Sequence, residues 1–304
     1  MTMKTITVLG ALGRQGGSVV RSLVQDGSFQ VRGVTSSQLD SPPVKSLENL
    51  EVKMFEGSPK DPCSLAPAFE GADTAFIVVN FWDPEIMMKE QDLTQEIMDV
   101  AKAAGVKHVI YSALANVEQV TDGKLNVPHF TGKAKAHEYL QTLGFEVVTT
   151  VEPAAYYSNW LTLMKPHEDE DGTLVWTWTG DGKAFSHFDV DTGTGPAVLE
   201  VAKHPEKYNG KQILLEAEKL TPEQIVSGVA QKMGKKGRIH YLPLEEYAKL
   251  FPGADELAEM VQWFDQYGYY GPETQARHHQ SGKAIGGLIS FEEWLESEAF
   301  QKLV

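Results

Sequence analysis

Short runs of β-branched and apolar residues alternate with amphipathic stretches through the first half of the chain. Continuous apolar runs of this length are typical of strands, and apolar residues three and four positions apart are typical of helices. The expected strands are Thr5–Leu9, Gln30–Thr35, Val52–Glu56, Thr74–Val79, His108–Ser112 and Glu146–Val151. The expected helices are Gly16–Gln25, Lys89–Ala104 and Gly132–Leu143. This repeated order predicts an α/β fold with a doubly wound parallel sheet.

After Pro153 the predicted strands and helices no longer alternate regularly. Asp191 is expected to cap a helix over Ala197–Ala202, and Thr221-Pro-Glu-Gln224 opens another helix with a capping-box pattern. The other expected elements are strands over Thr173–Thr179, Lys211–Glu216 and Arg238–Leu242, and helices over Glu245–Leu250, Ala254–Tyr267 and Phe291–Glu298. We predict a larger domain over residues 1–152 and a smaller mixed α/β C-terminal lobe over 153–304. The lobes are expected to interlock, with some segments returning to the first.

The composition narrows the class of protein. The 304 residues carry a formal net charge of −15, which argues against broad contact with nucleic acid because phosphate backbones require a basic face. A single cysteine, Cys63, cannot form an intramolecular disulfide and fits a reducing compartment. No apolar run approaches a membrane span, and the first residues run directly into a strand without room for a signal peptide. We expect a soluble cytoplasmic protein without membrane or direct nucleic-acid contact, and leave a nuclear location open.

Three glycines, Gly10, Gly13 and Gly16, follow the first expected strand and open the first expected helix. In a dinucleotide-binding loop, one glycine makes the tight turn, one lets backbone N–H groups approach the pyrophosphate, and one lets the helix pack closely on the strand. The helix N-terminus adds a partial positive charge. The alternative is a glycine-rich turn without a ligand. The order of strand, glycines and helix favours the first interpretation and predicts an NAD(P)-binding Rossmann fold for residues 1–152.

The segment after the second strand bears on the choice of cofactor. NAD sites usually place Asp or Glu there to bind the ribose 2′-hydroxyl, whereas a 2′-phosphate prefers cations or hydroxyl groups. Here the segment is Val34-Thr35-Ser36-Ser37-Gln38, with no acid, so NADP(H) is the predicted cofactor. Arg14, within the glycine loop, is the nearest candidate cation for the 2′-phosphate. The alternative for Arg14 is a solvated side chain on the loop.

Several short motifs occur in a characteristic order along the whole chain. They are Val8-Leu-Gly-Ala-Leu-Gly-Arg-Gln-Gly-Gly-Ser-Val19, Phe76-Ile-Val-Val-Asn80-Phe81-Trp82, His129-Phe-Thr-Gly132-Lys133, Pro205-Glu-Lys-Tyr208-x-Gly210, Phe251-Pro-Gly253-Ala254 and Phe291-Glu-Glu-Trp294-Leu295. In order and spacing they resemble the NmrA-like family, an atypical branch of the extended short-chain dehydrogenase/reductases. The likeness is greater to the NADPH-sensor proteins of that family than to its isoflavone-reductase-type enzymes.

The resemblance implies a set of cofactor-binding residues. It assigns the glycine loop to the phosphates, Thr35–Ser37 to the adenosine ribose, and the third-strand tail to the adenine; Lys133 would meet the nicotinamide ribose, and Tyr156 or Tyr157 the nicotinamide end. In full, the predicted residues are Gly10, Leu12, Gly13, Arg14, Gln15, Gly16, Thr35, Ser36, Ser37, Gly57, Ser58, Asn80, Phe81, Lys133 and Tyr156. The sensor relatives usually carry an arginine within the Thr35–Ser37 stretch. Its absence here implies that 2′-phosphate recognition is weaker or comes from Arg14.

Active dehydrogenases of this superfamily use Tyr-x-x-x-Lys, in which the tyrosine transfers the proton that accompanies hydride movement and the lysine binds the ribose. The same spacing here holds His129 and Lys133. An imidazole donates protons near neutral pH, so His129 is either the donor or a surface histidine beside a lysine kept for binding. The missing tyrosine favours the second interpretation, and we assign no catalytic residue. His187-x-Asp189-x-Asp191 lacks the further ligands of a metal site, so no metal is predicted.

Two functions of different classes are compatible with these features. The first, which the missing tyrosine favours, is an NADP(H)-binding regulator or redox sensor that acts through protein partners, such as transcriptional or metabolic regulators. The second is an NADPH-dependent reductase of a small carbonyl, quinone or enone. An apolar cavity beside the nicotinamide, lined by Tyr156, Tyr157 and Trp160, would favour the enzyme. The identity of the partner or substrate and the formation of a homodimer stay open.

Overall fold

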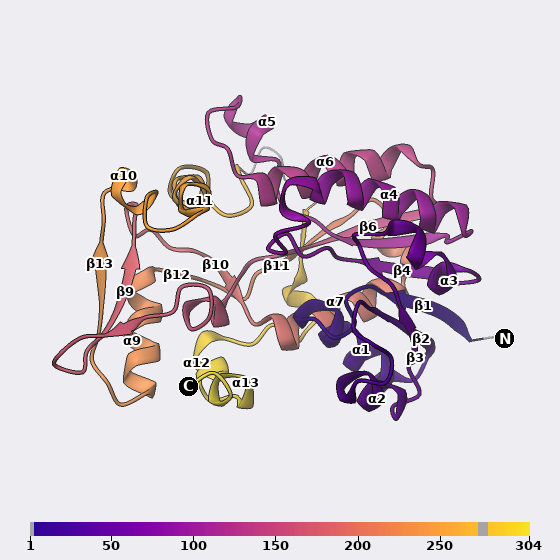
Figure 1. Cartoon of the computed structure of the whole chain (residues 1–304), viewed down its shortest axis with the longest axis horizontal. Helices are drawn as coiled ribbons and strands as arrows, with labels where there is room; N and C mark the ends of the chain where they lie inside the picture. Colours follow the sequence, from indigo (N-terminus) through magenta and orange to yellow (C-terminus); the bar gives the residue numbers. More distant parts are fainter. Residues whose placement is uncertain (1–2, 273–278) are drawn as a thin grey trace.

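A parallel sheet of eight strands forms the centre of the larger lobe (Figure 1). The computed structural model describes residues 3–272 and 279–304. The strand order is β14-β11-β6-β5-β4-β1-β2-β3, and every neighbouring pair is parallel. The strands are β1 (Lys4–Val8), β2 (Phe29–Thr35), β3 (Lys53–Glu56), β4 (Thr74–Ile77), β5 (His108–Ser112), β6 (Val147–Pro153), β11 (Gln212–Leu215) and β14 (His279–Ser281). The predicted doubly wound sheet is confirmed.

Helices cover both faces of this sheet, with α4 and α6 on one face and α1 and α7 on the other (Figure 1). Because both faces are covered, all residues of β4 and β5 are buried. The helices and 3₁₀ turns of this lobe are α1 (Arg14–Asp26), α2 (Pro42–Glu48), η1 (Pro62–Leu65), α3 (Ala66–Phe69), η2 (Met87–Lys89), α4 (Glu90–Ala103), α5 (Val117–Thr121), α6 (Pro128–Thr142), α7 (Val190–Lys203) and α8 (Pro205–Tyr208).

Two three-stranded sheets and the remaining helices make up the smaller lobe. Their orders are β12-β10-β7 and β13-β9-β8, and each contains one parallel and one antiparallel pair. The strands are β7 (Ala155–Tyr156), β8 (His167–Glu168), β9 (Leu174–Trp178), β10 (Phe185–Phe188), β12 (Glu218–Leu220) and β13 (Gly237–Tyr241). The helices and turns are η3 (Tyr157–Trp160), α9 (Pro222–Lys232), α10 (Leu244–Tyr247), α11 (Ala254–Tyr267), η5 (Gly282–Ala284), α12 (Phe291–Leu295) and α13 (Glu298–Gln301). This lobe is mixed α/β, as predicted.

The two lobes exchange segments. β11, β14 and α7 follow residue 153 in sequence, yet both strands extend the central sheet and α7 packs against α1. The two helices approach closely because Gly195 has no side chain: a Cβ there would lie 2.2 Å from the carbonyl oxygen of Ser18. The Ser18 hydroxyl donates to the Asp191 carbonyl at 2.7 Å and accepts from the Gly195 N–H at 2.9 Å. Segments from both halves of the sequence therefore surround the start of α1.

Several helix boundaries differ from the sequence prediction; the expected helix over Phe291–Glu298, for example, is divided into α12 and α13. α6 begins at Pro128, four residues before the expected start, because proline is tolerated in a first turn where its N–H would have no partner. The N-cap of α7 is Asp189, whose carboxylate accepts from the Thr192 N–H at 3.2 Å, so the prediction that Asp191 caps this helix is wrong. Asp191 lies in the first turn of α7 and is therefore free to pair with other elements. The predicted capping box of Thr221 is confirmed.

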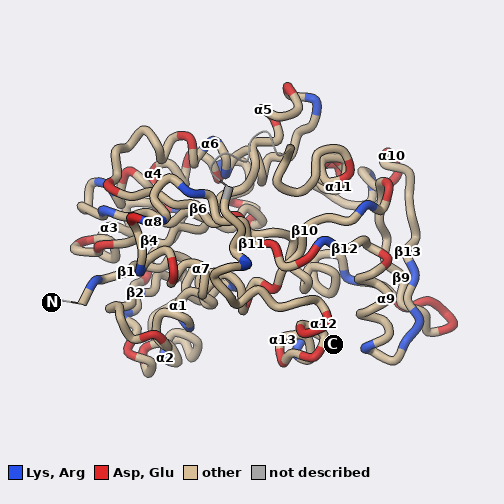
Figure 2. Tube along the Cα trace, turned by 180° about the vertical axis from the view of Figure 1, so that it is seen from behind, with Lys and Arg blue, Asp and Glu red and all other residues tan. Residues whose placement is uncertain are grey.

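Charged side chains are spread over both lobes. Figure 2 shows acidic segments on α13 and beside α9, with basic segments between them. The acidic pair Glu168 and Asp169 forms ion pairs with Lys235 and Arg238. Among residues 3–272 and 279–304, no helix has both the length and the apolar character needed to cross a membrane. The same residues contain no group of His, Cys, Asp or Glu that could hold a metal ion, and Cys63 is an exposed free thiol.

Candidate functional site

A large cavity lies at the carboxyl ends of the central strands, where doubly wound sheets bind their ligands. Its volume is about 950 Å³, and residues of both lobes line it. All of the residues predicted to bind the cofactor lie on its wall, namely Gly10, Leu12, Gly13, Arg14, Gln15, Gly16, Thr35, Ser36, Ser37, Gly57, Ser58, Asn80, Phe81, Lys133 and Tyr156. The fold therefore gathers them around one space. That each contacts a bound dinucleotide stays a prediction.

The glycine loop joins β1 to α1, and its glycines have different physical roles. Gly10 has a φ of +61°, in the left-handed region that favours glycine. A Cβ on Gly16 would lie 2.2 Å from the Gly10 carbonyl oxygen, so helix and strand require a glycine there to pack. Gly13, the N-cap of α1, has an ordinary φ of −79° and contributes only its lack of a side chain. The first turn of α1 carries no acid, so its N–H groups and partial positive charge stay available to an anion.

Two buried polar atoms on the cavity wall have no partner within the part of the chain that the structure describes. They are Oε1 of Gln15 and Oγ of Ser112. Buried polar atoms in folded proteins are normally hydrogen-bonded, so these atoms fit a polar ligand in the cavity. Together with the N-terminus of α1 and the bare backbone at Gly13, they fit a dinucleotide whose pyrophosphate lies at α1.

The end of β2 forms the wall predicted to face the adenosine ribose. Ser36 and Ser37 are exposed, and the Thr35 hydroxyl accepts from the Ser37 N–H at 3.1 Å. Lys60, a cation that the sequence prediction did not include, also lines the cavity. Its ammonium group pairs with Asp83 at 3.1 Å and with Glu85. Hydroxyl groups and a lysine already paired with two carboxylates therefore surround this end of the cavity.

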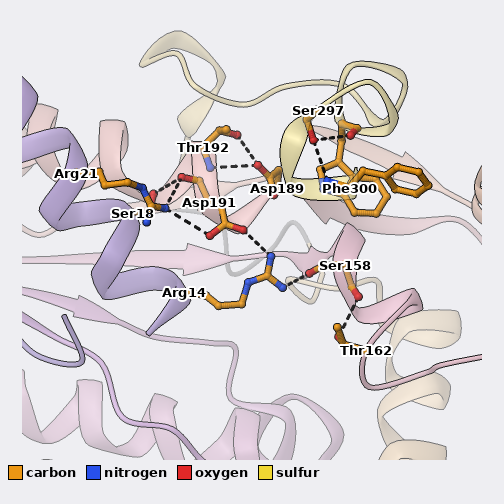
Figure 3. Close-up of polar contacts among 11 residues, drawn as sticks. Arg14, Ser18, Arg21, Ser158, Thr162, Asp189, Asp191, Thr192, Ser297 and Phe300 are labelled. Atoms are coloured by element: carbon orange, nitrogen blue, oxygen red, sulfur yellow. Dashed lines mark hydrogen bonds and ion pairs between the residues drawn. The ribbon is translucent and has the colours of Figure 1, made fainter. Parts of the chain in front are cut away.

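Arg14 is tied to the second half of the chain. Its guanidinium forms an ion pair with Asp191 of α7 at 2.6 Å and donates a hydrogen bond to Ser158 of η3 (Figure 3). Its Cζ lies 5.9 Å from the ring centroid of Tyr156. These three partners belong to segments that follow β6, whereas the ribose wall belongs to β2, on the other side of β1 in the sheet. Contact with a 2′-phosphate stays a prediction, and it requires the ion pair with Asp191 to open.

Lys133 lies one turn into α6 and is held by two groups. Its ammonium donates to the Val79 carbonyl at 3.1 Å and pairs with Glu90 at the start of α4. The side chains of Lys133 and Glu90 are only 11% and 3% exposed. An ammonium group has three donors, so one donor is left for a ligand hydroxyl. The sequence analysis missed Glu90 because an acid in the first turn of a helix is ordinary.

His129 is not a surface histidine, and that alternative is wrong. The residue is 8% exposed, lines the cavity, and lies among the rings of Phe81, Trp82 and Phe130 with centroid distances of 4.9–5.5 Å. Its Nδ1 atom lies 2.5 Å from Oε1 of Glu256 on α11. The sequence spacing from Lys133 suggested this position for His129, but no local pattern indicated Glu256.

Most of the cavity wall that the smaller lobe supplies is apolar, and Tyr156 and Asn159 are polar members of it. We call the following set the apolar wall; it consists of Leu163, Met164, Trp178, Phe185, Leu257, Met260, Phe264 and Tyr269. Tyr157 and Trp160, whose presence on this wall would have favoured the enzyme, are fully buried in the core instead. Trp160 donates from Nε1 to His187 at 3.2 Å. Closeness to Tyr156 in the sequence does not place a residue on the cavity wall, because the residues of η3 face different sides of that turn.

Tyr156 links the glycine loop to the smaller lobe. The Gln15 amide donates to its hydroxyl at 2.9 Å, and the ring contacts Phe188 edge-on at a centroid distance of 5.5 Å. Burial raises the pKa of the Tyr156 hydroxyl, and Gln15 and Arg14 oppose this effect. The phenol therefore stays protonated at neutral pH.

A glycine loop leading into α1, on a parallel doubly wound sheet with a cavity at the strand ends, defines a protein of the Rossmann dinucleotide-binding class. The chain belongs to the NmrA-like family, whose model matches residues 2–295.

Individual relatives agree with this assignment. The NmrA-like oxidoreductase FrzB of Cladobotryum sp. is 33% identical over 251 residues, covering 77% of this chain and 74% of the relative. An NmrA-like family domain-containing protein of Dictyostelium discoideum, DDB_G0286605, is 28% identical over 306 residues, covering 96% and 97%. The crystal structure of Nmra, a negative transcriptional regulator, in complex with NAD matches with a TM-score of 0.81 and 25% identity, covering 99% of this chain and 97% of that one. Another structure of Nmra holds NADP and matches with a TM-score of 0.81 and 24% identity over the same shares.

Proposed function

We propose that this chain is an NAD(P)H-dependent reductase of a small, flat, apolar carbonyl, quinone or enone, and that NADP(H) is its preferred cofactor. Several curated relatives are named oxidoreductases, which supports a reductase. Nmra structures hold NAD or NADP, which supports a nicotinamide dinucleotide as the cofactor. A reduced nicotinamide dinucleotide, when bound, supplies a hydride to an acceptor carbon.

The residues of the chain have separate tasks in this proposal. The N–H groups at the start of α1 bind the pyrophosphate, and Gly13 keeps the approach open. The remaining donor of Lys133 binds a ribose hydroxyl, with Glu90 and Val79 fixing the ammonium group. Ser36 and Ser37 offer hydroxyls to a 2′-phosphate, which is why NADP(H) is favoured.

The apolar wall carries the proposal that a second molecule binds beside the cofactor. A sensor needs only the nucleotide half of the cavity, and a continuous apolar extension serves no purpose in binding a charged dinucleotide. The aromatic side chains Trp178, Phe185, Phe264 and Tyr269 favour a flat apolar ligand. Such a wall also excludes water from the reacting carbon.

An NADP(H) sensor that acts through regulatory protein partners, in the cytoplasm or nucleus, is the second candidate. The observation that favours it is the histidine at position 129, where active members of the superfamily carry tyrosine. In a sensor, cofactor occupancy would alter the contact between the lobes at Arg14 and Ser158, and partners would read that change.

A two-stage experiment separates the candidates. Trp82 and Trp178 line the cavity, so their fluorescence reports titrations with NADPH, NADP, NADH and NAD. Oxidation of NADPH is then followed with menadione, phenanthrenequinone and cinnamaldehyde. Saturable turnover with any of these acceptors supports the reductase. Tight NADPH binding without turnover on the whole panel contradicts the reductase and favours the sensor, and absence of any dinucleotide binding contradicts both.

A further inference from the structure

α6 presents two basic side chains to the cavity, and each is held by a carboxylate from a different helix. His129 and Lys133 are one turn apart and therefore lie on the same helix face. Lys133 pairs with Glu90 of α4, and His129 with Glu256 of α11. The side chains of His129 and Glu256 are each 11% exposed. Lys133 already has a role in holding the ribose, whereas His129 has none in cofactor binding.

The contact with Glu256 fixes which nitrogen of His129 carries the proton. Oε1 of Glu256 accepts from the backbone N–H of His129 at 3.1 Å and lies 2.5 Å from Nδ1 of the ring. A carboxylate accepts hydrogen bonds, so Nδ1 carries a proton in the neutral ring as well as in the imidazolium. Within residues 3–272 and 279–304, Nε2 takes part in no hydrogen bond. Nε2 is therefore the nitrogen left for a ligand.

Aromatic rings restrict the orientation of the imidazole. Trp82 lies at a centroid distance of 5.2 Å, Phe81 at 5.5 Å and Phe130 at 4.9 Å. These rings and the bond to Glu256 hold a titratable group on the wall of a cavity whose neighbouring wall is apolar. Anchoring of α6 to Glu256 does not require the imidazole ring, because the backbone N–H of His129 already donates to that carboxylate.

We propose that His129 is the proton donor of the reductase and that Glu256 is its positioning residue. This inference rests on the proposed reductase function. As the hydride forms a C–H bond at the acceptor carbon, the π electrons of the C=O bond move to oxygen, and Nε2 of the imidazolium gives that oxygen its proton. The imidazole is left neutral, with Nδ1–H still bound to Glu256, and regains a proton at Nε2 from water. The imidazole thereby takes the place of the phenol used by related enzymes.

The cavity wall contains rival donors that the test must separate. Tyr156 and Tyr269 both carry a phenol and both line the cavity. Burial raises the pKa of each, so each holds its proton at neutral pH. The variants His129→Phe, Tyr156→Phe and Tyr269→Phe remove one proton donor at a time and keep a ring in place.

A matched control distinguishes proton transfer from anchoring of α6. Glu259, one turn further along α11, also accepts from a backbone N–H near the start of α6, that of Asn126, but does not contact His129. Glu259→Gln therefore makes the same chemical change as Glu256→Gln, but at a carboxylate that only anchors the segment before α6. Loss of kcat in Glu256→Gln with an unchanged kcat in Glu259→Gln is the expected result.

NADPH affinity by fluorescence, and kcat and KM with menadione or phenanthrenequinone, are measured on each variant. The ¹⁵N shifts of the His129 ring are measured on the parent and on Glu256→Gln. We expect His129→Phe to bind NADPH within about twofold of the parent and to lose about 10²–10⁴-fold in kcat, the usual contribution of a general acid. We expect the neutral form of the parent ring to carry its proton at Nδ1 and to lose this preference in Glu256→Gln. His129→Tyr is expected to regain part of the lost activity.

Two results overturn the donor role alone. Undiminished kcat in His129→Phe excludes His129 as the donor while the reductase stands, and a large loss of kcat in Tyr156→Phe or Tyr269→Phe assigns the proton to that phenol. A parent ring that carries its proton at Nε2 instead of Nδ1 in the neutral form shows that Glu256 does not position it. A third result, NADPH binding without turnover by the parent on every acceptor, overturns the reductase function itself and the donor role with it.

Discussion

The ammonium group of Lys133 forms an ion pair with Glu90, a carboxylate that is only 3% exposed. The second oxygen of Glu90 is buried without a partner among the described residues, so Lys133 is the cation that compensates this charge. Lys133 therefore has two roles, one in the stability of the fold and one at the cavity wall. A variant that removes the lysine tests both at once, and the two effects need separate measurements.

Lys133→Ala should destabilise the fold by about 3–5 kcal/mol, because it leaves the Glu90 carboxylate buried and unpaired. Lys133→Met combined with Glu90→Gln should recover most of this loss. Urea denaturation of the single and double variants measures both changes. Lys135→Ala is the control: its pair with Glu118 is largely exposed, so it should cost at most about 1 kcal/mol. Equal losses for Lys133→Ala and Lys135→Ala would contradict a structural role of the buried pair.

The effect of Lys133 on cofactor binding is measured in proteins that also carry Glu90→Gln, because this change removes the buried unpaired carboxylate. The double variant Lys133→Met, Glu90→Gln should bind NADPH more weakly than Glu90→Gln alone by about 1–3 kcal/mol, the scale of a lost hydrogen bond to a charged group. Fluorescence titration measures this difference. Equal affinities would show that Lys133 serves the fold only.

Gly13→Val should fold but lose most of its dinucleotide affinity. The φ of Gly13, −79°, suits valine, and a Cβ would lie 3.1 Å from the Gly10 carbonyl oxygen, a tight contact that small shifts relieve. The two methyl groups would occupy the approach to the N-terminus of α1. Gly16→Ala, in contrast to Gly13→Val, should destabilise the fold, because its Cβ would lie 2.2 Å from the same oxygen. Circular dichroism and NADPH titration separate the two outcomes, and normal affinity in folded Gly13→Val would show that the loop does not hold the phosphates.

Ser36→Asp should shift the cofactor preference toward NAD. A carboxylate at the end of β2 would accept a hydrogen bond from a 2′-hydroxyl and repel a 2′-phosphate. The ratio of NADP to NAD affinity should fall by about tenfold or more, since one charge-assisted hydrogen bond is worth roughly 1.5–3 kcal/mol. Ser46→Asp on α2 adds the same charge away from the cavity wall and should leave the ratio unchanged. Equal ratios in both variants would place the ribose elsewhere.

Arg14→Ala should weaken NADP and NAD by a similar factor and leave their ratio unchanged. The guanidinium is held by Asp191 and Ser158, and both lie on segments that follow β6 and not beside β2 (Figure 3). A narrowed NADP preference in Arg14→Ala would instead show that the ion pair opens and that Arg14 moves to the 2′-phosphate. Titrations of both oxidised cofactors decide between these outcomes.

The sequence predicts several single elements of both lobes well because their signals are local. β5 and α11 occupy the expected residues, His108–Ser112 and Ala254–Tyr267, since apolar periodicity and glycine stops define them within one segment. The glycine loop could be predicted for the same reason. The pairs of charged residues that meet across the site could not be predicted from the sequence. Lys133 and Glu90 are 43 residues apart, His129 and Glu256 are 127 apart, and Arg14 and Asp191 are 177 apart. Only the packing of α6 on α4 and α11, and of α7 on α1, brings these charges together.

Glu152, at the end of β6, gives the chain a distinct dependence of stability on pH. It is 2% exposed, and burial raises the pKa of its carboxyl from 4.5 to about 7. Below pH 4.5 the group is protonated in both the folded and the unfolded chain. Between pH 4.5 and 7 the unfolded chain releases the proton and the folded chain retains it, so the free energy of unfolding falls as the pH rises.

Two buried histidines act in the opposite direction. Burial lowers the pKa of His187 to about 3 and of His108 to about 4, so the unfolded chain binds protons that the folded chain does not. Their contribution to stability is present above pH 6.5 and is lost as the pH falls toward these values. The pH profile of the parent protein is therefore a sum of opposing effects, and only a difference between two proteins isolates Glu152.

Glu152→Gln should remove the Glu152 contribution and retain the shape and polarity of the side chain. The variant should gain stability relative to the parent as the pH rises from 4.5 to 7, reaching about 3 kcal/mol above pH 7, on the scale of 1.4 kcal/mol per pKa unit. Urea denaturation at pH 5, 6, 7 and 8 measures this difference. Glu146→Gln, at an exposed position directly before β6, is the control and should show a difference that does not change with pH. Parallel profiles for the parent and Glu152→Gln would show that the buried carboxyl is ionised in the folded protein at all of these pH values, and that another group compensates its charge.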